Sequence, residues 1–367
     1  MRVLMTADTV GGVWTFAHEL ACGLLERDCC VLLVSFGRMP SASQRKECDS
    51  LKRRFGRHFR YVASEIALEW MDDNAEVFEL GAALLEHEAA GFAPDILQSN
   101  QFCYGAVEMD VARVVTAHSD VFSWAKACRK EPLGDTPWLR NYVAQVQAGL
   151  AAADVVTAPT EWMLNAVEEN FVLPHRRMVI PNGRAVPPSF NRPRELRAVT
   201  AGRLWDAAKG ISLLEHVASP IPIAIAGESE FQTAHGMESV GSARLLGQLS
   251  QLEIMELFRD SAIYICPSVY EPFGLSALEA ARCGCAVVAR DIPSLREVWG
   301  DAALFFDSSE SLSGILGQLA GDPQSLRSAR RRSFERSLTF SRERMVEKYL
   351  MLFERVQTES ARAEHAA

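Results

Sequence analysis

The sequence predicts an α/β protein built from two doubly wound, Rossmann-like parallel sheets that face a cleft between two domains. Short β-branched runs alternate with amphipathic helical patterns along the chain, which favours parallel sheets covered by helices on both faces. The runs are apolar throughout, as is typical of strands buried on both sides. The alternation also begins twice, once on each side of a proline-rich segment.

Composition limits the class of protein. The 367 residues are 48% hydrophobic and 23% charged, which is typical of a folded chain. The net charge of −9 argues against a nucleic-acid partner, because nonspecific affinity for phosphates needs positive charge. The odd count of nine cysteines predicts reduced thiols and a cytoplasmic protein, and Cys283-Gly-Cys285 lacks the second pair that a metal site would need. We expect no signal peptide and no membrane-spanning segment.

The first domain is predicted over residues 1–185. A helix is expected over Val13–Arg27, where Phe16, Leu20 and Leu24 share one side. The expected strands are Arg2–Met5, Val31–Phe36, Ile96–Ser99, Arg113–Ala117, Val155–Ala158 and Met178–Ile180.

The second domain is predicted over residues 196–340. The segment Pro181–Glu195 contains four prolines and is interpreted as a linker. A C-terminal helix over residues 341–358 is expected to pack back on the first domain. The expected strands of the second domain are Arg197–Ala201, Ile221–Ala226, Ile263–Cys266 and Ala286–Ala289.

The most informative stretch is PSVYEPFGLSALE, which contains two carboxylates separated by seven residues, Glu271 and Glu279. Pro272 keeps Glu271 out of helical geometry, and a helix is expected over Leu275–Arg282, so that Glu279 lies on it. The free N–H groups and the positive dipole end at such a helix start suit a phosphate. The alternative is a loop acid and a solvated helix acid with no common role.

Two cations follow the first strand of the second domain, in the stretch AGRLWDAAKG. Arg203 comes directly after the strand, and Lys209 comes six residues later. A planar guanidinium and a point-like ammonium at the mouth of a parallel sheet could neutralise a diphosphate without a metal ion. The alternative is a solvent-facing pair that makes ordinary salt bridges.

Two weaker signals lie in the first domain. Gly11-Gly12 follows the first strand and resembles half of a phosphate-binding turn, although it could equally be a tight turn. His118 follows another strand and could hydrogen-bond a substrate hydroxyl or assist proton movement. The alternative for His118 is a structural histidine.

These elements occur in the order in which the retaining glycosyltransferases of family 4 have them, and the chain resembles that family over nearly its whole length. The E-x7-E motif matches Glu271 and Glu279, and the G-R-L…K-G element matches Gly202 to Gly210. The N-terminal G-G-V element, the V-V-T-x-H element of His118 and the I-x-N-G linker at Ile180 also match. The resemblance implies the GT-B fold.

The resemblance also implies roles for the polar side chains. Arg203 and Lys209 would hold the donor diphosphate and stabilise charge on the leaving nucleotide. Glu271 would contact hydroxyls of the donor sugar, and Glu279 would accept hydrogen bonds from the ribose. His118 would hydrogen-bond the donor sugar near the reacting carbon.

Backbone groups would complete the site. Phe273, Gly274 and Leu275 would present N–H groups to the sugar and phosphate. Gly12 would lie where the first domain meets the phosphates or the acceptor. The segment Leu245–Leu249, which includes Gly247, would line the base pocket through its backbone.

The sequence departs from the family pattern at three places. Ile292-Pro293-Ser294 stands where Gly-Gly often precedes a glutamate, here Glu297, so no sugar contacts are assigned there. Gly227-Glu228-Ser229 replaces the usual G-x-G. In the first domain, Gln98 and Asn100 stand in place of a histidine and are expected to face the acceptor.

The implied reaction transfers a sugar from a nucleoside diphosphate sugar to an acceptor hydroxyl in glycan or glycoconjugate biosynthesis, with retained configuration and no metal or other cofactor. The acceptor could be a sugar, a small molecule or a lipid-linked sugar. The alternatives are a nucleotide-sugar epimerase or phosphorylase on the same fold, or a noncatalytic nucleotide-sugar-binding protein.

Two basic runs could also matter for partners. The first run consists of Arg45, Lys46, Lys52, Arg53, Arg54, Arg57 and Arg60. It could meet anionic lipid at the inner membrane face, although such runs are usually solvated. The second run lies at Arg327–Arg336.

Overall fold

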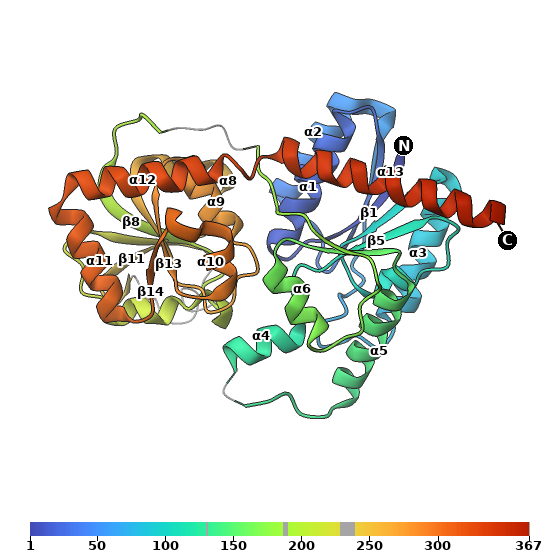
Figure 1. Cartoon of the computed structure of the whole chain (residues 1–367), viewed down its shortest axis with the longest axis horizontal. Helices are drawn as coiled ribbons and strands as arrows, with labels where there is room; N and C mark the ends of the chain where they lie inside the picture. Colours follow the sequence, from blue (N-terminus) through green and yellow to red (C-terminus); the bar gives the residue numbers. More distant parts are fainter. Residues whose placement is uncertain (130, 186–189, 228–238, 367) are drawn as a thin grey trace. The chain divides into compact units, whose positions relative to one another are not determined.

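The computed structural model of the chain divides into two compact units (Figure 1). It describes residues 1–129, 131–185, 190–227 and 239–366, with side chains described up to residue 359. The first unit runs to Gly183, except for a short segment at 126–130, and resumes at Arg342. The second unit takes that short segment and Arg184–Ser341.

The first unit contains a seven-stranded sheet in which all paired strands are parallel, in the order β3-β2-β1-β4-β5-β6-β7. The inner strands are buried along almost their whole length, which explains their apolar sequences. The strands are β1 (Arg2–Asp8), β2 (Cys30–Phe36), β3 (Phe59–Ala63), β4 (Ile96–Ser99), β5 (Ala112–Thr116), β6 (Val155–Ala158) and β7 (Arg177–Val179).

Helices connect these strands, and polar caps begin three of them. Ser41, Thr136 and Thr160 each accept a hydrogen bond from a backbone N–H in the first turn of the helix that follows. The helices are α1 (Gly12–Leu25), α2 (Ala42–Phe55), α3 (Val77–Phe92), α4 (Val121–Cys128), α5 (Pro137–Ala152) and α6 (Glu161–Glu168).

The C-terminal helix α13 (Arg342–Ala366) belongs to the first unit, although it is last in the sequence. Its apolar side chains Met345, Tyr349 and Phe353 are buried in one core cluster with residues of α1. The two helices approach closely at Gly23, where an added Cβ would lie 2.3 Å from Val346 Cγ2. Glycine is therefore required there for this packing.

The second unit contains another seven-stranded sheet, in the order β10-β11-β9-β8-β12-β13-β14. Its strand pairs are parallel except for β10 with β11. The strands are β8 (Glu195–Ala201), β9 (Ile223–Ala226), β10 (Ser239–Val240), β11 (Ala243–Gly247), β12 (Ser261–Cys266), β13 (Ala286–Arg290) and β14 (Leu304–Phe306). The helices are α8 (Gln251–Asp260), α9 (Leu275–Arg282), α10 (Pro293–Trp299), α11 (Ser309–Gly321) and α12 (Pro323–Ser337).

The predicted class of two doubly wound α/β sheets is confirmed, and every predicted strand overlaps an observed one. Four strands were not predicted, namely β3, β10, β11 and β14. β10 and β14 are very short, and Arg60 and Arg244 interrupt the apolar runs of β3 and β11. Their sequences therefore lack the continuous apolar signal of the central strands.

Candidate functional site

Arg203 is held at the carboxyl end of β8 by a carboxylate that the sequence analysis did not identify. Its guanidinium lies 2.6 Å from Asp206 Oδ2 and over the ring of Trp205. Asp206 is buried and also accepts a hydrogen bond from the N–H of Ala208. Desolvation alone would raise the pKa of Asp206, but the hydrogen bond from Arg203 lowers it below its ordinary value. The guanidinium is therefore held in one orientation by an ionised partner.

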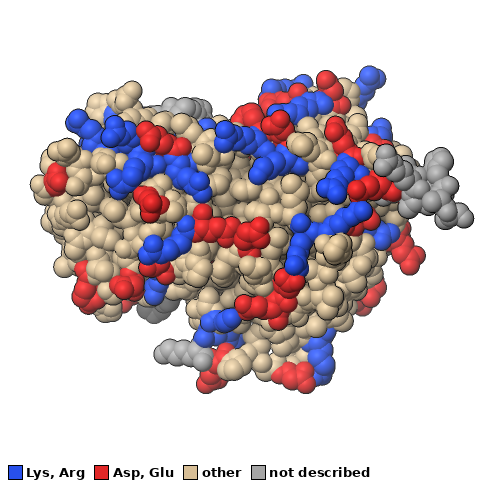
Figure 2. Space-filling view, in the orientation of Figure 1, with Lys and Arg blue, Asp and Glu red and all other residues tan. Residues whose placement is uncertain are grey.

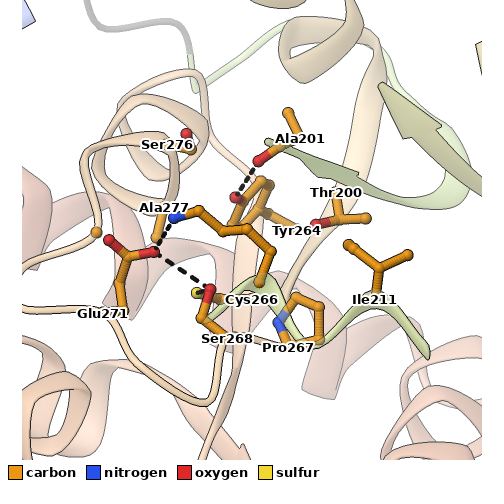
Figure 3. Close-up of a pocket in the computed structure, with 12 residues that line it drawn as sticks. Thr200, Ala201, Ile211, Tyr264, Cys266, Pro267, Ser268, Glu271, Ser276 and Ala277 are labelled. Carbon is orange, nitrogen blue, oxygen red and sulfur yellow. Dashed lines mark hydrogen bonds and ion pairs between the residues drawn. The ribbon is translucent and has the colours of Figure 1, made fainter. Parts of the chain in front are cut away.

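Lys209 extends from the short 3-10 helix η3 (Ala207–Lys209) along the backbone of Gly202, where an added Cβ would lie 3.4 Å from Lys209 Cδ. Its Nζ is 2.6 Å from Glu271 Oε2, and the Ser268 hydroxyl donates to the same oxygen at 3.2 Å (Figure 3). Desolvation would lower the pKa of Lys209, but the Glu271 carboxylate raises it. Lys209 is therefore charged at neutral pH.

Glu271 lies in the loop between β12 and α9, and α9 begins at Leu275 as predicted. The Ser294 hydroxyl donates to the backbone oxygen of Glu271 at 2.7 Å, which fixes the loop. Gly274 precedes α9 with a φ of +90°, and no side chain caps the helix there. The first N–H groups of α9 thus have no helical partner, as a phosphate site requires.

Lys209, Glu271 and Gly274 line one pocket at the carboxyl ends of β8 and β12, together with Ser268 and Ser276 (Figure 3). Arg203 lies close enough to Lys209 to act on its ionisation. The pocket thus combines a half-buried ammonium, a carboxylate and the amino end of a helix. Such a set can bind an anion and, beside it, groups that donate hydrogen bonds.

The other predicted backbone residues have different surroundings. The side chain of Phe273 is buried and packs edge-on against Phe340, so only its backbone is available to a ligand. Gly247 ends β11 with a φ of +74°, and Leu249 packs on the core after it. Glu228 and Ser229 lie outside the described residues.

Glu279 lies on α9 beyond its first turn, and the structure pairs it with a residue that the sequence analysis did not single out. Its Oε1 is 2.7 Å from the Arg184 guanidinium, and both residues are buried. Arg184 directly follows the I-x-N-G element, at the point where the chain enters the second unit. Its position beside that element is the only sequence signal that could have revealed it.

In the first unit, His118 and Asn100 are bonded to each other. His118 Nε2 is 2.9 Å from Asn100 Oδ1, and Asn100 Nδ2 donates to the Thr6 backbone oxygen at 2.6 Å. Because the Asn100 amide has its oxygen toward the ring, Nε2 carries the proton and Nδ1 remains an acceptor. Burial lowers the pKa of His118 to about 3, so the imidazole is neutral near pH 7.

Gln98 requires a correction. The analysis of the sequence expected it to face an acceptor, but its side chain is fully buried and donates to Thr116 Oγ1 at 2.7 Å. Thr116 in turn bonds Thr157 and the Tyr349 hydroxyl of α13. β4 is an inner strand whose four residues are all buried, so Gln98 has no solvent-facing side.

Gly12 is the first residue of α1 and is exposed, and Gly11 before it has a φ of +98°. The glycine pair therefore forms a tight entry to a helix at the carboxyl end of β1. His118, Asn100 and Gly12 all follow strands of the first sheet, whereas Arg203, Lys209, Glu271 and Glu279 belong to the second unit.

Both units match known sequence families. The family described as Glycosyltransferase Family 4 matches residues 10–186, and the family described as Glycosyl transferases group 1 matches residues 198–336. Among relatives, the O-antigen chain mannosyltransferase B of Escherichia coli is 40% identical over 70 residues, 19% of this chain and 18% of that protein. The alpha-maltose-1-phosphate synthase of Mycobacterium tuberculosis is 26% identical over 293 residues, 67% of this chain and 73% of that protein.

Solved structures show the same fold. The sucrose-phosphate synthase of Thermosynechococcus elongatus superposes with a TM-score of 0.79 at 16% identity, over 98% of this chain and 100% of that one. The structure of Anabaena Alr3699/HepE in complex with UDP-glucose superposes with a TM-score of 0.69 at 17% identity, over 96% of this chain and 99% of that one.

The two α/β sheets and these structural neighbours show that the chain has the GT-B fold. The chain belongs to the glycosyltransferases that combine a family 4 domain with a group 1 domain, as its resemblance implies. In the described residues, no helix is both long and apolar enough to cross a membrane.

Proposed function

We propose that this glycosyltransferase moves a sugar from a nucleoside diphosphate sugar to an acceptor hydroxyl with retention of the anomeric configuration. The observation that supports this most strongly is the shared pocket of Lys209, Glu271 and Gly274. The ammonium and the helix start would take the diphosphate, and the carboxylate would take hydroxyls of the sugar. The Anabaena structure in complex with UDP-glucose gives this donor class a precedent on the same fold.

The departing diphosphate is the main electrostatic problem of such a reaction. When the bond between the anomeric carbon and the phosphate oxygen breaks, the electron pair goes to that oxygen and negative charge accumulates there. Arg203 and Lys209 are already oriented by Asp206 and Glu271, so they need little reorganisation to stabilise this charge. We propose that these groups replace a metal ion. Turnover unchanged by a chelator would support this, and loss that Mg²⁺ or Mn²⁺ restores would contradict it.

Retention follows if the acceptor attacks on the face that the diphosphate leaves. The acceptor oxygen would then bond to the anomeric carbon while its proton moves to a phosphate oxygen. Two carboxylates placed on opposite faces of the sugar, as in glycosidases, are not needed in this scheme. A sugar found covalently attached to Glu271 would contradict it.

The experiment that tests the function has two parts. A thermal-shift screen of nucleoside diphosphate sugars identifies the donor, because a ligand of the folded state raises the melting temperature. Proton NMR of the transfer product with that donor then gives the anomeric configuration. If no nucleotide sugar stabilises the protein, or if the product is inverted, the proposal fails.

The first basic run, on α2 and the segment that follows it, is the candidate surface for a lipid-linked acceptor. Five of its seven Lys and Arg residues lie on α2, and all seven are exposed, although Arg54 and Arg60 pair with Glu26 and Glu88. Basic and acidic side chains are interspersed over the face shown in Figure 2. Co-sedimentation of the protein with anionic vesicles, abolished by charge reversal on α2, would support peripheral membrane contact.

The later basic run has a structural use, because Arg330 and Arg336 donate to backbone oxygens at the ends of α9 and α10.

A further inference from the structure

Apart from the short segment 126–130, the chain passes between the two units twice, and these two passages are hydrogen-bonded to each other. The main part of the second unit begins at Arg184 and ends at Ser341. These two residues form a parallel β-bridge, and the N–H of Arg184 donates to the Phe340 oxygen at 3.2 Å. A change at one passage is therefore transmitted to the other.

Both passages are also attached to α9. From the first passage, the Arg184 guanidinium reaches Glu279 at 2.7 Å. From the second, the Phe340 ring packs edge-on against Phe273, with ring centroids 5.4 Å apart. Phe273 immediately precedes Gly274, the N-cap residue of α9. The start and the middle of this helix are thus each held by one passage.

The Arg184–Glu279 pair is buried, which gives it physical consequences that a surface pair lacks. A buried carboxylate without a partner is costly, and the Arg184 guanidinium supplies that partner and fixes the orientation of Glu279. A carboxylate has about four lone-pair positions and can accept several hydrogen bonds at once, so an ion pair with a guanidinium is compatible with bonds from ribose hydroxyls. Arg184 therefore prepares Glu279 to bind rather than competing with the ligand.

We propose that Arg184 is a positioning residue that orients Glu279 for the ribose and thereby links occupation of the nucleotide site to the order of the two interunit passages. The inference rests on the proposed function, in which Glu279 accepts hydrogen bonds from the ribose. Arg184 itself touches no ligand in this scheme. Its guanidinium acts only through the carboxylate.

The test compares the binding of ribonucleotides with the binding of nucleotides whose ribose lacks both hydroxyls. Kd values are measured by calorimetry for UDP, GDP and ADP and for their 2′,3′-dideoxy counterparts, and the best-bound base is kept. Wild-type protein should prefer the ribonucleotide. Arg184→Gln should weaken ribonucleotide binding about tenfold, which is the effect of losing well-oriented hydrogen bonds to a charged group. Binding of the dideoxynucleotide should stay unchanged, so the preference disappears.

Further variants separate positioning from mere stability. Arg184→Lys keeps the charge and should restore part of the ribose preference. In Glu279→Gln, the additional change Arg184→Gln should have no further effect on the preference, because Arg184 acts through that carboxylate. Arg192→Gln is the matched control, since Arg192 lies in the same linker but pairs with Glu256 on the surface. It should bind as wild type does.

Each outcome has a distinct meaning. If wild-type protein binds no nucleotide, or binds ribo and dideoxy forms equally, the proposed function of Glu279 fails. If wild-type protein prefers ribose and a folded Arg184→Gln protein keeps that preference, the role of Arg184 fails. If Arg184→Gln does not fold, the Arg184→Lys variant decides. If that variant keeps the full wild-type preference for the ribonucleotide, the planar guanidinium is not needed and the proposed role of Arg184 is wrong.

Amide hydrogen exchange tests the link to the passages. Nucleotide should slow exchange at the Arg184 N–H, which bonds Phe340, in wild-type protein. In Arg184→Gln, saturating nucleotide should no longer do so. Equal slowing in both proteins would show that the passages respond to nucleotide without Arg184.

Discussion

The carboxyl edges of the two sheets carry polar side chains of different kinds. In the second unit, Arg203, Lys209 and Glu279 are each bonded to a group of opposite charge. In the first unit, the bonded groups His118 and Asn100 are neutral, and burial keeps the imidazole unprotonated. This difference fits the proposed function, in which the second sheet would bind the charged diphosphate and His118 and Asn100 would face hydroxyl groups.

The largest effect is expected from the two cations of the second sheet. Arg203→Ala and Lys209→Met should each reduce kcat about 100- to 1000-fold, because one preorganised charge-stabilising donor is removed. Methionine keeps most of the stem that lies along Gly202. The measurement is steady-state transfer with the identified donor, beside a melting curve.

Arg259→Ala is the control for these variants, since Arg259 makes a surface pair with Glu256. It should leave kcat within about twofold, because exposed pairs contribute little. Near-normal turnover in Arg203→Ala would remove that residue from the mechanism and weaken the contrast between the two sheet edges.

A second effect is expected at the start of α9. Gly274→Ala puts a Cβ at a φ of +90° and 3.4 Å from Glu271 Cγ, so it strains the turn and crowds the carboxylate. We expect a stability loss of about 1–2 kcal/mol and weaker nucleotide binding. Gly314→Ala in α11 has nothing within 4 Å of the added Cβ and should not destabilise. Unchanged nucleotide affinity in Gly274→Ala would mean that the helix start is not a ligand site.

A smaller, pH-dependent effect is expected at His118. His118→Gln should lower kcat/KM about tenfold through loss of one neutral hydrogen bond. The shape of the pH–rate profile between pH 5 and 8 should stay the same, because the wild-type imidazole does not titrate there. A profile whose acidic limb disappears in His118→Gln would show that the ring does titrate, and would contradict its neutral role.

His118 should also affect acid stability. Its pKa falls from an ordinary 6.5 to about 3 on folding, so the unfolded chain binds a proton that the folded chain does not bind in this range. Stability therefore decreases as the pH falls from 6.5 toward 3. Urea unfolding at pH 7 and pH 5 should show a smaller loss in His118→Gln than in wild-type protein.

The smallest effect is expected at Gln98. Because this side chain lies in the core with Thr116, Gln98→Leu should leave kcat and KM within about twofold. Stability should change by no more than about 1 kcal/mol, since Thr116 keeps its bonds to Thr157 and Tyr349. A large rise in the KM of an acceptor would restore Gln98 to the acceptor side.

Much of the fold could be predicted because its signals are local. Buried parallel strands give apolar runs, and Pro272 and Gly274 mark the start of α9 within a few residues. Partners far apart in the sequence left no such signal. Neither the pairing of Arg184 with Glu279 nor the burial of Gln98 could be read locally, since each depends on which segments the sheet brings together.

The close contact of α13 with α1 has a consequence for the order of folding during synthesis. Met345, Tyr349 and Phe353 complete the core of the first unit, yet they leave the ribosome after the second unit. Nearly all of the second unit has emerged by then, because its chain ends at Ser341. The unit that is translated first therefore cannot complete its core until α13 has emerged, and that core stays open to chaperones while the second unit is made.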